Sequence, residues 1–234
     1  MKTAVLLAAG RGARLKPYTD VTPKPLLPVQ GVPTLDLYFK ALQAVGFERA
    51  LLVTHYLADQ IEQYAQQVPQ RFQMACSTVH QTTLDGTASA LEAVVDKLNA
   101  DASFLLMATD YLLTPHFISD FISFHNQHDA DLSVSLKRVP AAELSSRSSV
   151  RFDGSDNITE IVEKPEPGKA PSEFSANLAF VLPSAVLEYL PSVSASPRGE
   201  REVQSAINTY LANGGRARGL IQDTPSEWTP DISG

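Results

Sequence analysis

The sequence has little of several features that define protein classes. It contains one cysteine, Cys76, in 234 residues, which excludes an internal disulfide and a cysteine-rich zinc site. No apolar run approaches the roughly 20 residues of a membrane-spanning helix, so we expect no membrane partner. Positive charge is also scarce, because 19 Lys and Arg oppose 26 Asp and Glu, for a net charge of −7. Proteins that bind the nucleic-acid backbone normally have a basic surface, so we expect no nucleic-acid partner.

Two common phosphate-binding motifs are also missing. The pattern G-x-x-x-x-G-K-[ST] does not occur, so the chain has no Walker-type phosphate loop. Gly10 and Gly12 begin the dinucleotide pattern G-x-G-x-x-G, but Leu15 stands in place of its third glycine. The apolar stretch at residues 4–9 is too short for a secretory signal, and a single cysteine fits a reducing compartment. We therefore expect a cytoplasmic protein.

The first half of the chain alternates short apolar runs with helical patterns. Apolar residues make up 44% of the chain and charged residues 19%, which is typical of a globular protein. Helices are expected where apolar residues recur at helical spacing, and strands where they form short continuous runs. The expected strands are 5–7, 50–53, 72–79 and 104–108, and the expected helices are 35–45, 57–64 and 88–98. This alternation predicts an α/β, Rossmann-like fold, with a mostly parallel central sheet and helices on both faces.

The second half is richer in strands and has few helices. Strands are expected at 132–137, 150–152, 158–162, 174–182 and 217–221, and a helix at 202–211. Few helices between strands favour antiparallel pairing. We therefore expect a single domain over residues 1–234, in which a half at 1–130 and a more antiparallel half at 131–234 share one sheet.

The loop after the first strand concentrates positive charge in an otherwise acidic chain. Gly10 and Gly12 allow backbone N–H groups to approach an anion closely. Prolines at 17, 23, 25 and 28 restrict the loop that carries its four cations, Arg11, Arg14, Lys16 and Lys24. A restricted, basic, glycine-containing loop at the end of a first parallel strand is suited to a triphosphate.

This loop resembles the sugar-1-phosphate nucleotidyltransferases, such as glucose-1-phosphate thymidylyltransferases and uridylyltransferases. Residues 7–29 match the family pattern L-A-A-G-x-G-x-R-L-x-P-x-T followed by T-P-K-P-L-x-P-V at nearly every fixed position. Thinner matches follow in the family's order: Gln81 with residues 85–88, Asp110 after an apolar strand, residues 163–165, and Gly199-Glu200 before a helix. The resemblance assigns residues 1–130 to the nucleotide and residues 131–234 to the sugar phosphate.

The resemblance implies a reaction in which an NTP and a sugar 1-phosphate give an NDP-sugar and pyrophosphate. Arg14, Lys24 and Asp110 are then the catalytic residues. The nucleotide-binding residues implied by the match are Leu7, Ala9, Gly10, Arg11, Gly12, Arg14, Lys24, Gln81, Gly86 and Thr87. An amide such as Gln81 offers both a donor and an acceptor, which suits the imide edge of uracil or thymine. We therefore favour UTP or dTTP, although Gln81 also fits a polar turn before a helix.

A catalytic Mg²⁺ is the cofactor that the resemblance implies. Asp110 would bind it, although Thr109 stands where the family usually has glycine and is expected to narrow the site. A second carboxylate normally follows a tryptophan. Asp231, three residues after Trp228, is the candidate, with Asp223 and Glu227 as alternatives, and the sequence stops soon afterwards.

The sugar phosphate would meet the Glu163-Lys164-Pro165 match. Lys164 would neutralise the phosphate, and Glu163 would accept hydrogen bonds from sugar hydroxyls. The alternative interpretation is that Glu163 and Lys164 form a surface ion pair. Asn177 is a candidate sugar contact or a structural polar group. Two other functions remain open. One is cytidylyl or guanylyl transfer to another phosphorylated acceptor, such as phosphocholine or mannose 1-phosphate. The other is a non-catalytic regulatory subunit that binds nucleotide sugars. Dimers and tetramers are frequent in the family, so a homo-oligomer is one expected state.

Overall fold

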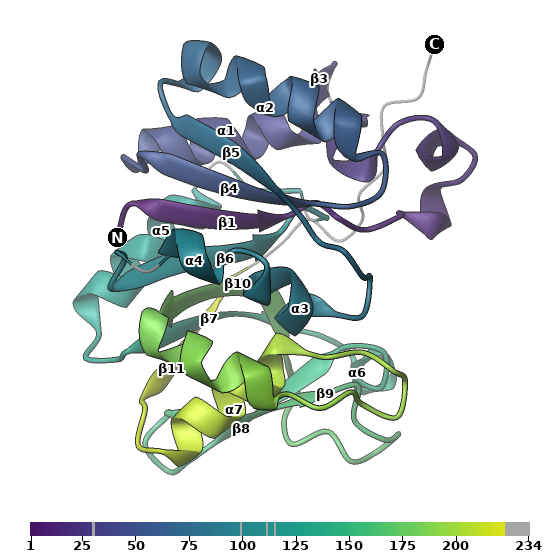
Figure 1. Cartoon of the computed structure of the whole chain (residues 1–234). Helices are drawn as coiled ribbons and strands as arrows, with labels where there is room; N and C mark the ends of the chain where they lie inside the picture. Colours follow the sequence, from purple (N-terminus) through teal and green to yellow (C-terminus); the bar gives the residue numbers. More distant parts are fainter. Residues whose placement is uncertain (30, 99, 111, 115, 223–234) are drawn as a thin grey trace.

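A nine-stranded sheet runs through the molecule (Figure 1). The computed structural model describes residues 1–29, 31–98, 100–110, 112–114 and 116–222. The strand order is β5-β4-β1-β6-β10-β7-β11-β9-β8. In chain order the strands are β1 (Thr3–Leu7), β4 (Arg49–Thr54), β5 (Ala75–His80), β6 (Ser103–Ala108), β7 (Leu132–Arg138), β8 (Ser148–Phe152), β9 (Ile158–Glu163), β10 (Phe174–Pro183) and β11 (Ala217–Ile221).

The pairing pattern confirms a mostly parallel sheet with a more antiparallel second half. β1 lies parallel between β4 and β6, β4 pairs in parallel with β5, and β7 pairs in parallel with β11. Within the nine-stranded sheet, every antiparallel pairing contains β9 or β10, which run against the other strands. β10 is inserted between β6 and β7, so strands from both halves of the chain belong to one continuous sheet.

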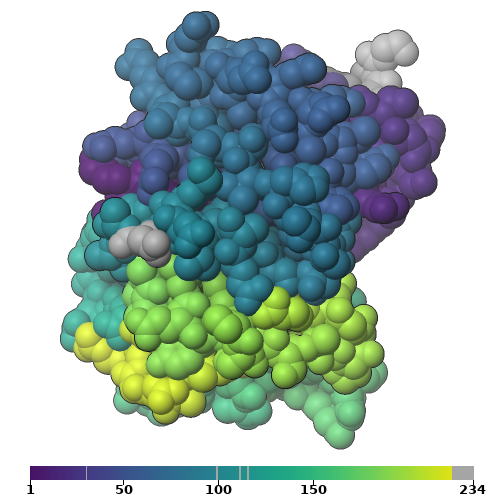
Figure 2. Space-filling view, in the orientation of Figure 1, coloured from purple at the N-terminus to yellow at the C-terminus, as the bar shows by residue number. Residues whose placement is uncertain are grey.

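Helices cover both faces of the sheet, as predicted, because successive strand residues point to opposite sides. Val5 belongs to one apolar cluster and Leu6 to the other. The cluster of Leu6 is completed by α1 (Thr34–Ala44), α2 (Ala58–Phe72) and α5 (Phe117–Gln127). The cluster of Val5 is completed by α3 (Thr87–Glu92), α4 (Val95–Leu98), the 3₁₀ segment η4 (Ser184–Ser192) and α7 (Val203–Ala212). Figure 2 shows the surface of this second face, where the green residues of the second half border the teal residues of the first.

Some expected boundaries are wrong. Phe72 does not open a strand but ends α2, because Ile61, Tyr64 and Val68 continue the apolar helical face well past residue 64. The helix expected at 88–98 is broken into α3 and α4 by a turn at Ala93 and Val94. Sequence periodicity also gave no sign of η4. Among the described residues, no helix combines the length and apolar character needed to cross a membrane.

The loop after β1 is built from three short 3₁₀ turns. They are η1 (Ala13–Leu15), η2 (Tyr18–Asp20) and η3 (Lys24–Leu26), and a small hairpin of β2 (Pro28–Val29) and β3 (Val32–Pro33) follows them. Gly12 precedes η1 with a φ of 60°, a left-handed conformation that favours glycine. The remaining short helix, α6 (Ala141–Leu144), lies between β7 and β8. The turns hold the loop at the carboxyl ends of β1 and β6, which is where parallel sheets bind ligands.

Candidate active site

A cleft of about 770 Å³ opens at this edge of the sheet and receives residues from both halves of the chain. The expected nucleotide-binding residues all line it: Leu7, Ala9, Gly10, Arg11, Gly12, Arg14, Lys24, Gln81, Gly86 and Thr87. Asp110, Glu163 and Asn177 line it as well. The structure therefore brings together residues that are far apart in the sequence, in one cavity large enough for two small substrates.

The cations of the loop do not all face the cleft. Arg11, Arg14 and Lys24 line it, but Lys16 does not. Lys16 instead forms an ion pair with Asp20 one turn later, with the Nζ and the carboxylate oxygen 3.0 Å apart. Three of the four loop cations therefore share the cleft, and Lys16 has a local partner instead. Arg11 lies over the ring of Tyr56, 5.7 Å from the ring centroid.

Lys24 and Asp110 face each other in the cleft. The Lys24 Nζ lies 3.7 Å from a carboxylate oxygen of Asp110 and 3.5 Å from its backbone carbonyl oxygen. Burial lowers the pKa of Lys24 below its ordinary value, and the nearby charge of Asp110 opposes that shift only in part. The Asp110 side chain is 52% exposed, so its carboxylate stays accessible at the end of β6.

Thr109 occupies the position where the resembled family usually has glycine. Its hydroxyl donates a hydrogen bond of 2.8 Å to the carbonyl oxygen of Leu7, which joins the ends of β6 and β1. Thr109 is buried and lines the cleft beside Asp110. The side chain that Thr109 has and glycine lacks therefore helps to hold the two strand ends together.

Gln81 and Gly86 form a closed turn at the end of the cleft where we expect the nucleotide. Gln81 is buried, and its side-chain amide donates a hydrogen bond of 3.1 Å to the carbonyl oxygen of Gly86. Its backbone N–H donates to Thr54 at the end of β4, 2.8 Å away. The turn that we assigned to the base is thus anchored to the sheet.

The sugar-phosphate candidates differ in their surroundings. Glu163 is half-buried at the end of β9 and accepts a hydrogen bond of 3.0 Å from the side chain of Gln204. Burial raises the pKa of Glu163 to about 7, and the negative charge of Glu202 adds to the rise. Asn177 is buried and donates a hydrogen bond of 3.1 Å to the Ser135 hydroxyl, so it has a structural contact while it lines the cleft.

Lys164 is not among the residues that line the cleft. It has a φ of 46°, and its Nζ lies 3.7 Å from a carboxylate oxygen of Glu200.

The candidates for the second metal ligand, Asp231, Asp223 and Glu227, lie outside the described residues. Within the ranges that the structure describes, no cluster of three or more His, Cys, Asp or Glu side chains could hold a metal ion.

Several cleft residues were not predicted as site residues. Arg147 comes from the turn before β8, and Glu202 and Gln204 come from the start of α7. Leu84 adds an apolar side chain, 40% exposed, to the cleft. No local pattern marks these residues, because they reach the cleft through contacts between distant parts of the chain. Only Glu200 carried a signal, through the Gly199-Glu200 match.

Comparison with known proteins agrees with this geometry. Residues 3–229 match the family described as "Nucleotidyl transferase". The chain is 30% identical, over 211 residues, to the UTP–glucose-1-phosphate uridylyltransferase AglF of Haloferax volcanii, with 90% of this chain and 84% of that protein covered. It is 28% identical to the UTP–glucose-1-phosphate uridylyltransferase of a Synechocystis species, covering 90% of this chain and 57% of that one. It is 26% identical to the bifunctional protein GlmU of Methanocaldococcus jannaschii, covering 96% of this chain and 52% of the relative.

The chain thus spans most of the first relative but only a little over half of the other two. A crystal structure of UDP-glucose pyrophosphorylase with UDP-glucose superimposes with a TM-score of 0.81 at 20% identity, covering 96% of this chain and 92% of that one, which supports the fold. The family match over nearly the whole chain, together with a cleft that collects the family's motif residues, leads to one conclusion. The chain belongs to the nucleotidyl transferase family and is an enzyme of the sugar-1-phosphate nucleotidyltransferase type.

Proposed function

We propose that the enzyme transfers a nucleotidyl group from an NTP, preferably UTP or dTTP, to a sugar 1-phosphate and releases pyrophosphate. One observation carries the proposal: a single cleft holds the basic loop after β1, the Lys24–Asp110 pair, and the polar residues Glu163 and Asn177. The loop cations suit the triphosphate, and the polar residues of the second half suit the hydroxyls of a sugar. We propose the cytoplasm as its location, since the single cysteine suits a reducing compartment.

The proposed chemistry needs positioning and charge more than proton transfer. An oxygen of the sugar phosphate attacks the α-phosphorus of the NTP, and the bond from that phosphorus to the bridging oxygen of the β-phosphate breaks. The electron pair of that bond leaves with pyrophosphate. Because the attacking oxygen is already anionic at pH 7, no general base is required. Arg14 and Lys24 neutralise the triphosphate and the leaving pyrophosphate, and backbone N–H groups of residues 9–12 hold the phosphates.

Mg²⁺ is the proposed cofactor, and the donor chemistry of the cleft fits it. Mg²⁺ is usually held by one or two carboxylates together with substrate phosphates and water. Asp110 offers an accessible carboxylate at the end of β6, where the phosphates of the NTP would lie. The ion would neutralise charge that develops on the phosphates. Asp231 remains the proposed second ligand.

The remaining residues of the cleft would bind the nucleobase and the sugar. Gln81 and Gly86 would read the base, and the names of two relatives, which specify UTP and glucose 1-phosphate, support uracil and a hexose phosphate. Glu163 and Asn177 would contact the sugar. Lys164 would meet the acceptor phosphate, which requires its side chain to leave Glu200 and turn into the cleft.

Pyrophosphate release tests the proposal. The purified chain is incubated with Mg²⁺ and with each of ATP, CTP, GTP, UTP and dTTP, crossed with a panel of sugar 1-phosphates and with phosphocholine. We expect release for UTP or dTTP with a sugar 1-phosphate, and none for a matched Asp110→Asn preparation, which controls for contaminating activity. Release with CTP and phosphocholine, but with no sugar 1-phosphate, would replace the proposed acceptor. Silence over the whole panel would refute the proposed reaction.

A further inference from the structure

A short segment, Glu200 to Gln204, lies between the two halves of the cleft and contacts both. We call it the bridging segment. Its backbone is bonded to the turn at residues 85–88, which carries Gly86, one of the two proposed base-reading residues, and accepts a hydrogen bond from the other, Gln81. The Arg201 N–H donates to the carbonyl oxygen of Asp85 at 2.6 Å, and the Ala88 N–H donates to the carbonyl oxygen of Arg201 at 2.9 Å. The Val203 N–H donates to the Thr87 hydroxyl at 2.9 Å. Three hydrogen bonds therefore fix the segment against that turn.

Gly86 allows this close approach. It has a φ of 129°, and a Cβ at this position would lie only 2.1 Å from the carbonyl oxygen of Arg201. No side chain fits between the two backbones, so the turn and the bridging segment meet backbone to backbone.

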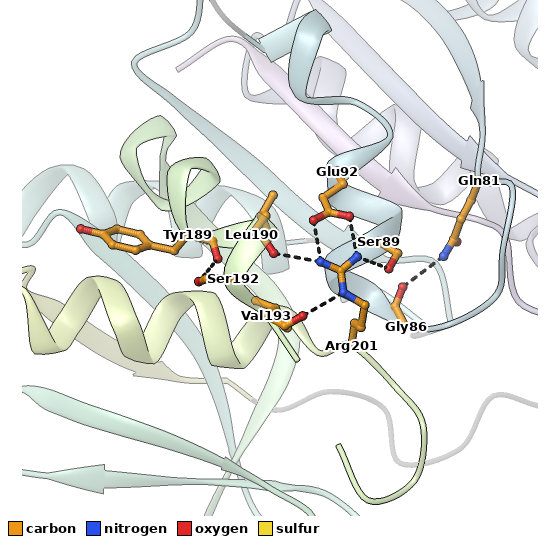
Figure 3. A network of polar contacts seen from close by, with 9 residues as sticks. All are labelled: Gln81, Gly86, Ser89, Glu92, Tyr189, Leu190, Ser192, Val193 and Arg201. Atoms are coloured by element: carbon orange, nitrogen blue, oxygen red, sulfur yellow. Dashed lines mark hydrogen bonds and ion pairs between the residues drawn. The ribbon is translucent and has the colours of Figure 1, made fainter. Parts of the chain in front are cut away.

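The side chain of Arg201 adds a second, denser set of contacts (Figure 3). Both terminal nitrogens pair with the two carboxylate oxygens of Glu92 on α3, each at 2.6 Å. The remaining N–H groups donate to the Ser89 hydroxyl and to the carbonyl oxygens of Leu190 and Val193, at 2.9 to 3.0 Å. The five hydrogen bonds engage all five donors of the guanidinium, and the Arg201 side chain is only 22% exposed. A lysine could not reproduce this fork.

The opposite side of the bridging segment faces the sugar-phosphate end. Glu200, Glu202 and Gln204 line the cleft, whereas Val203 packs into the apolar cluster of α3 and α7. Glu200 pairs with Lys164, and Gln204 donates a hydrogen bond to Glu163. The segment therefore touches both residues that we assign to the acceptor, and it is held in place by α3 of the nucleotide half.

We propose that Arg201 is a positioning residue that couples the two substrate sites. Through its fork to Glu92 and its backbone bonds, it holds the turn at residues 85–88 and, through Gln204, the side chain of Glu163 in one arrangement. An NTP that orders the turn at residues 85–88 then also orders the acceptor site. By linkage, the sugar phosphate strengthens NTP binding by the same factor. This inference rests on the proposed function.

The test compares Arg201→Lys, Arg201→Met and Glu92→Gln with the wild type. The matched control is Arg151→Met, which removes an exposed ion pair with Glu160 far from this contact. Pyrophosphate release is measured with UTP and glucose 1-phosphate. Binding of glucose 1-phosphate is measured by calorimetry with and without α,β-methylene-UTP, at a temperature at which thermal unfolding curves show every variant folded. The ratio of the two dissociation constants is the coupling factor.

We expect the wild type and Arg151→Met to show a coupling factor well above one. In the Arg201 and Glu92 variants it should fall toward one, and the KM for glucose 1-phosphate should rise about tenfold while kcat changes less. A merely structural role would lower the melting temperature and leave the coupling factor unchanged, and that result would overturn the proposal. If Arg201→Met does not fold, Arg201→Lys and Glu92→Gln decide the question in the same way. Absence of pyrophosphate release from the wild type would instead count against the proposed function, and the binding ratios would still test the coupling.

Discussion

Lys24 shows how one side chain combines burial with a functional charge. Burial lowers its pKa, and the carboxylate of Asp110 at 3.7 Å favours the charged form. An ammonium group that has already lost much of its hydration needs little further solvent reorganisation when negative charge develops on a phosphate beside it. The contrast with Lys16, which pairs with Asp20 outside the cleft, allows the role of Lys24 to be separated from the effect of net charge.

Lys24→Ala is expected to lower kcat for pyrophosphate release by about 10² to 10³-fold, because it removes a cation that faces the leaving group. Lys16→Ala removes the same charge from the same loop and serves as the control, with an expected change of less than about threefold. Steady-state kinetics at saturating NTP and sugar phosphate would measure both. An unchanged kcat for Lys24→Ala would refute its assigned role.

Glu163 makes stability depend on pH. Its pKa in the folded protein is about 7, above the ordinary 4.5, because of burial and the charge of Glu202, although Lys164 and Arg198 act in the opposite direction. Below pH 4.5 the carboxyl group is protonated in both the folded and the unfolded chain. Between pH 4.5 and 7 the unfolded chain loses the proton first, so the free energy of unfolding falls as the pH rises.

We therefore expect Glu163→Gln to gain stability relative to the wild type as the pH rises from 4.5 to 7, by at most about 3 kcal/mol, and to gain no more above that range. Urea unfolding at a series of pH values measures the difference. Glu166→Gln, on an exposed loop beside Lys169, controls for the loss of a surface charge. A stability difference that does not vary with pH would contradict the shifted pKa.

At the scale of elements, the loop after β1 depends on the backbone conformation at Gly12. With a φ of 60°, a Cβ there would lie 2.9 Å from the Cγ2 of Thr19 and 3.1 Å from the Cβ of Lys24. Gly10, two residues earlier, has no atom within 4 Å of the corresponding position. The same substitution at these two sites therefore separates backbone strain from a general effect on the loop.

Gly12→Ala is expected to lower the free energy of unfolding by about 1 to 2 kcal/mol, because alanine must adopt a left-handed conformation and displace Thr19 or Lys24. Gly10→Ala should leave stability within about 0.5 kcal/mol. Chemical denaturation of both variants, monitored by circular dichroism, is the measurement. Equal effects at the two glycines would show that strain at Gly12 is not what distinguishes them.

The sequence predicted the elements whose signals are local. The apolar run at 104–108 became β6, and the alternation at 132–137 became β7, although Ser133 and Ser135 are buried together with the apolar residues of that strand. The loop motif at residues 7–29 was legible for the same reason, since its glycines and cations are neighbours in the chain. Helix ends were harder to predict. The apolar face of α2 runs on to Phe72, past the expected end at residue 64, and the helix accommodates Pro69 in its last turn.

The parts of the site that could not be predicted depend on distant contacts. Gln204 is unremarkable in its local context, yet the packing of α7 brings it to Glu163, 41 residues earlier in the chain. Arg201 meets Glu92 across 109 residues. Lys164 was assigned from a motif, but its side chain pairs with Glu200, which only the fold brings close. A motif identifies a residue, whereas its orientation is set by neighbours that the motif does not contain.

At the scale of the whole molecule, β10 joins the two halves of the chain. Phe180 lies on this strand, opposite Leu106 of β6 on one side and Val134 of β7 on the other, and it is fully buried. A strand bonded to both halves in the middle of one sheet leaves neither half able to unfold without exposing the other. We therefore expect a single cooperative unfolding transition over the chain.

Phe180→Ala is expected to lower the free energy of unfolding by about 3 to 5 kcal/mol, through lost apolar burial and the cavity left behind. The loss should be felt equally in β4 of the first half and β8 of the second, because both depend on the same sheet. Native-state hydrogen exchange measures the protection of these strands separately, and Val21→Ala, at a residue that is 71% exposed, is the control. Protection that falls in β8 but persists in β4 would mean that the halves unfold independently, and that the chain behaves as two domains in spite of its continuous sheet.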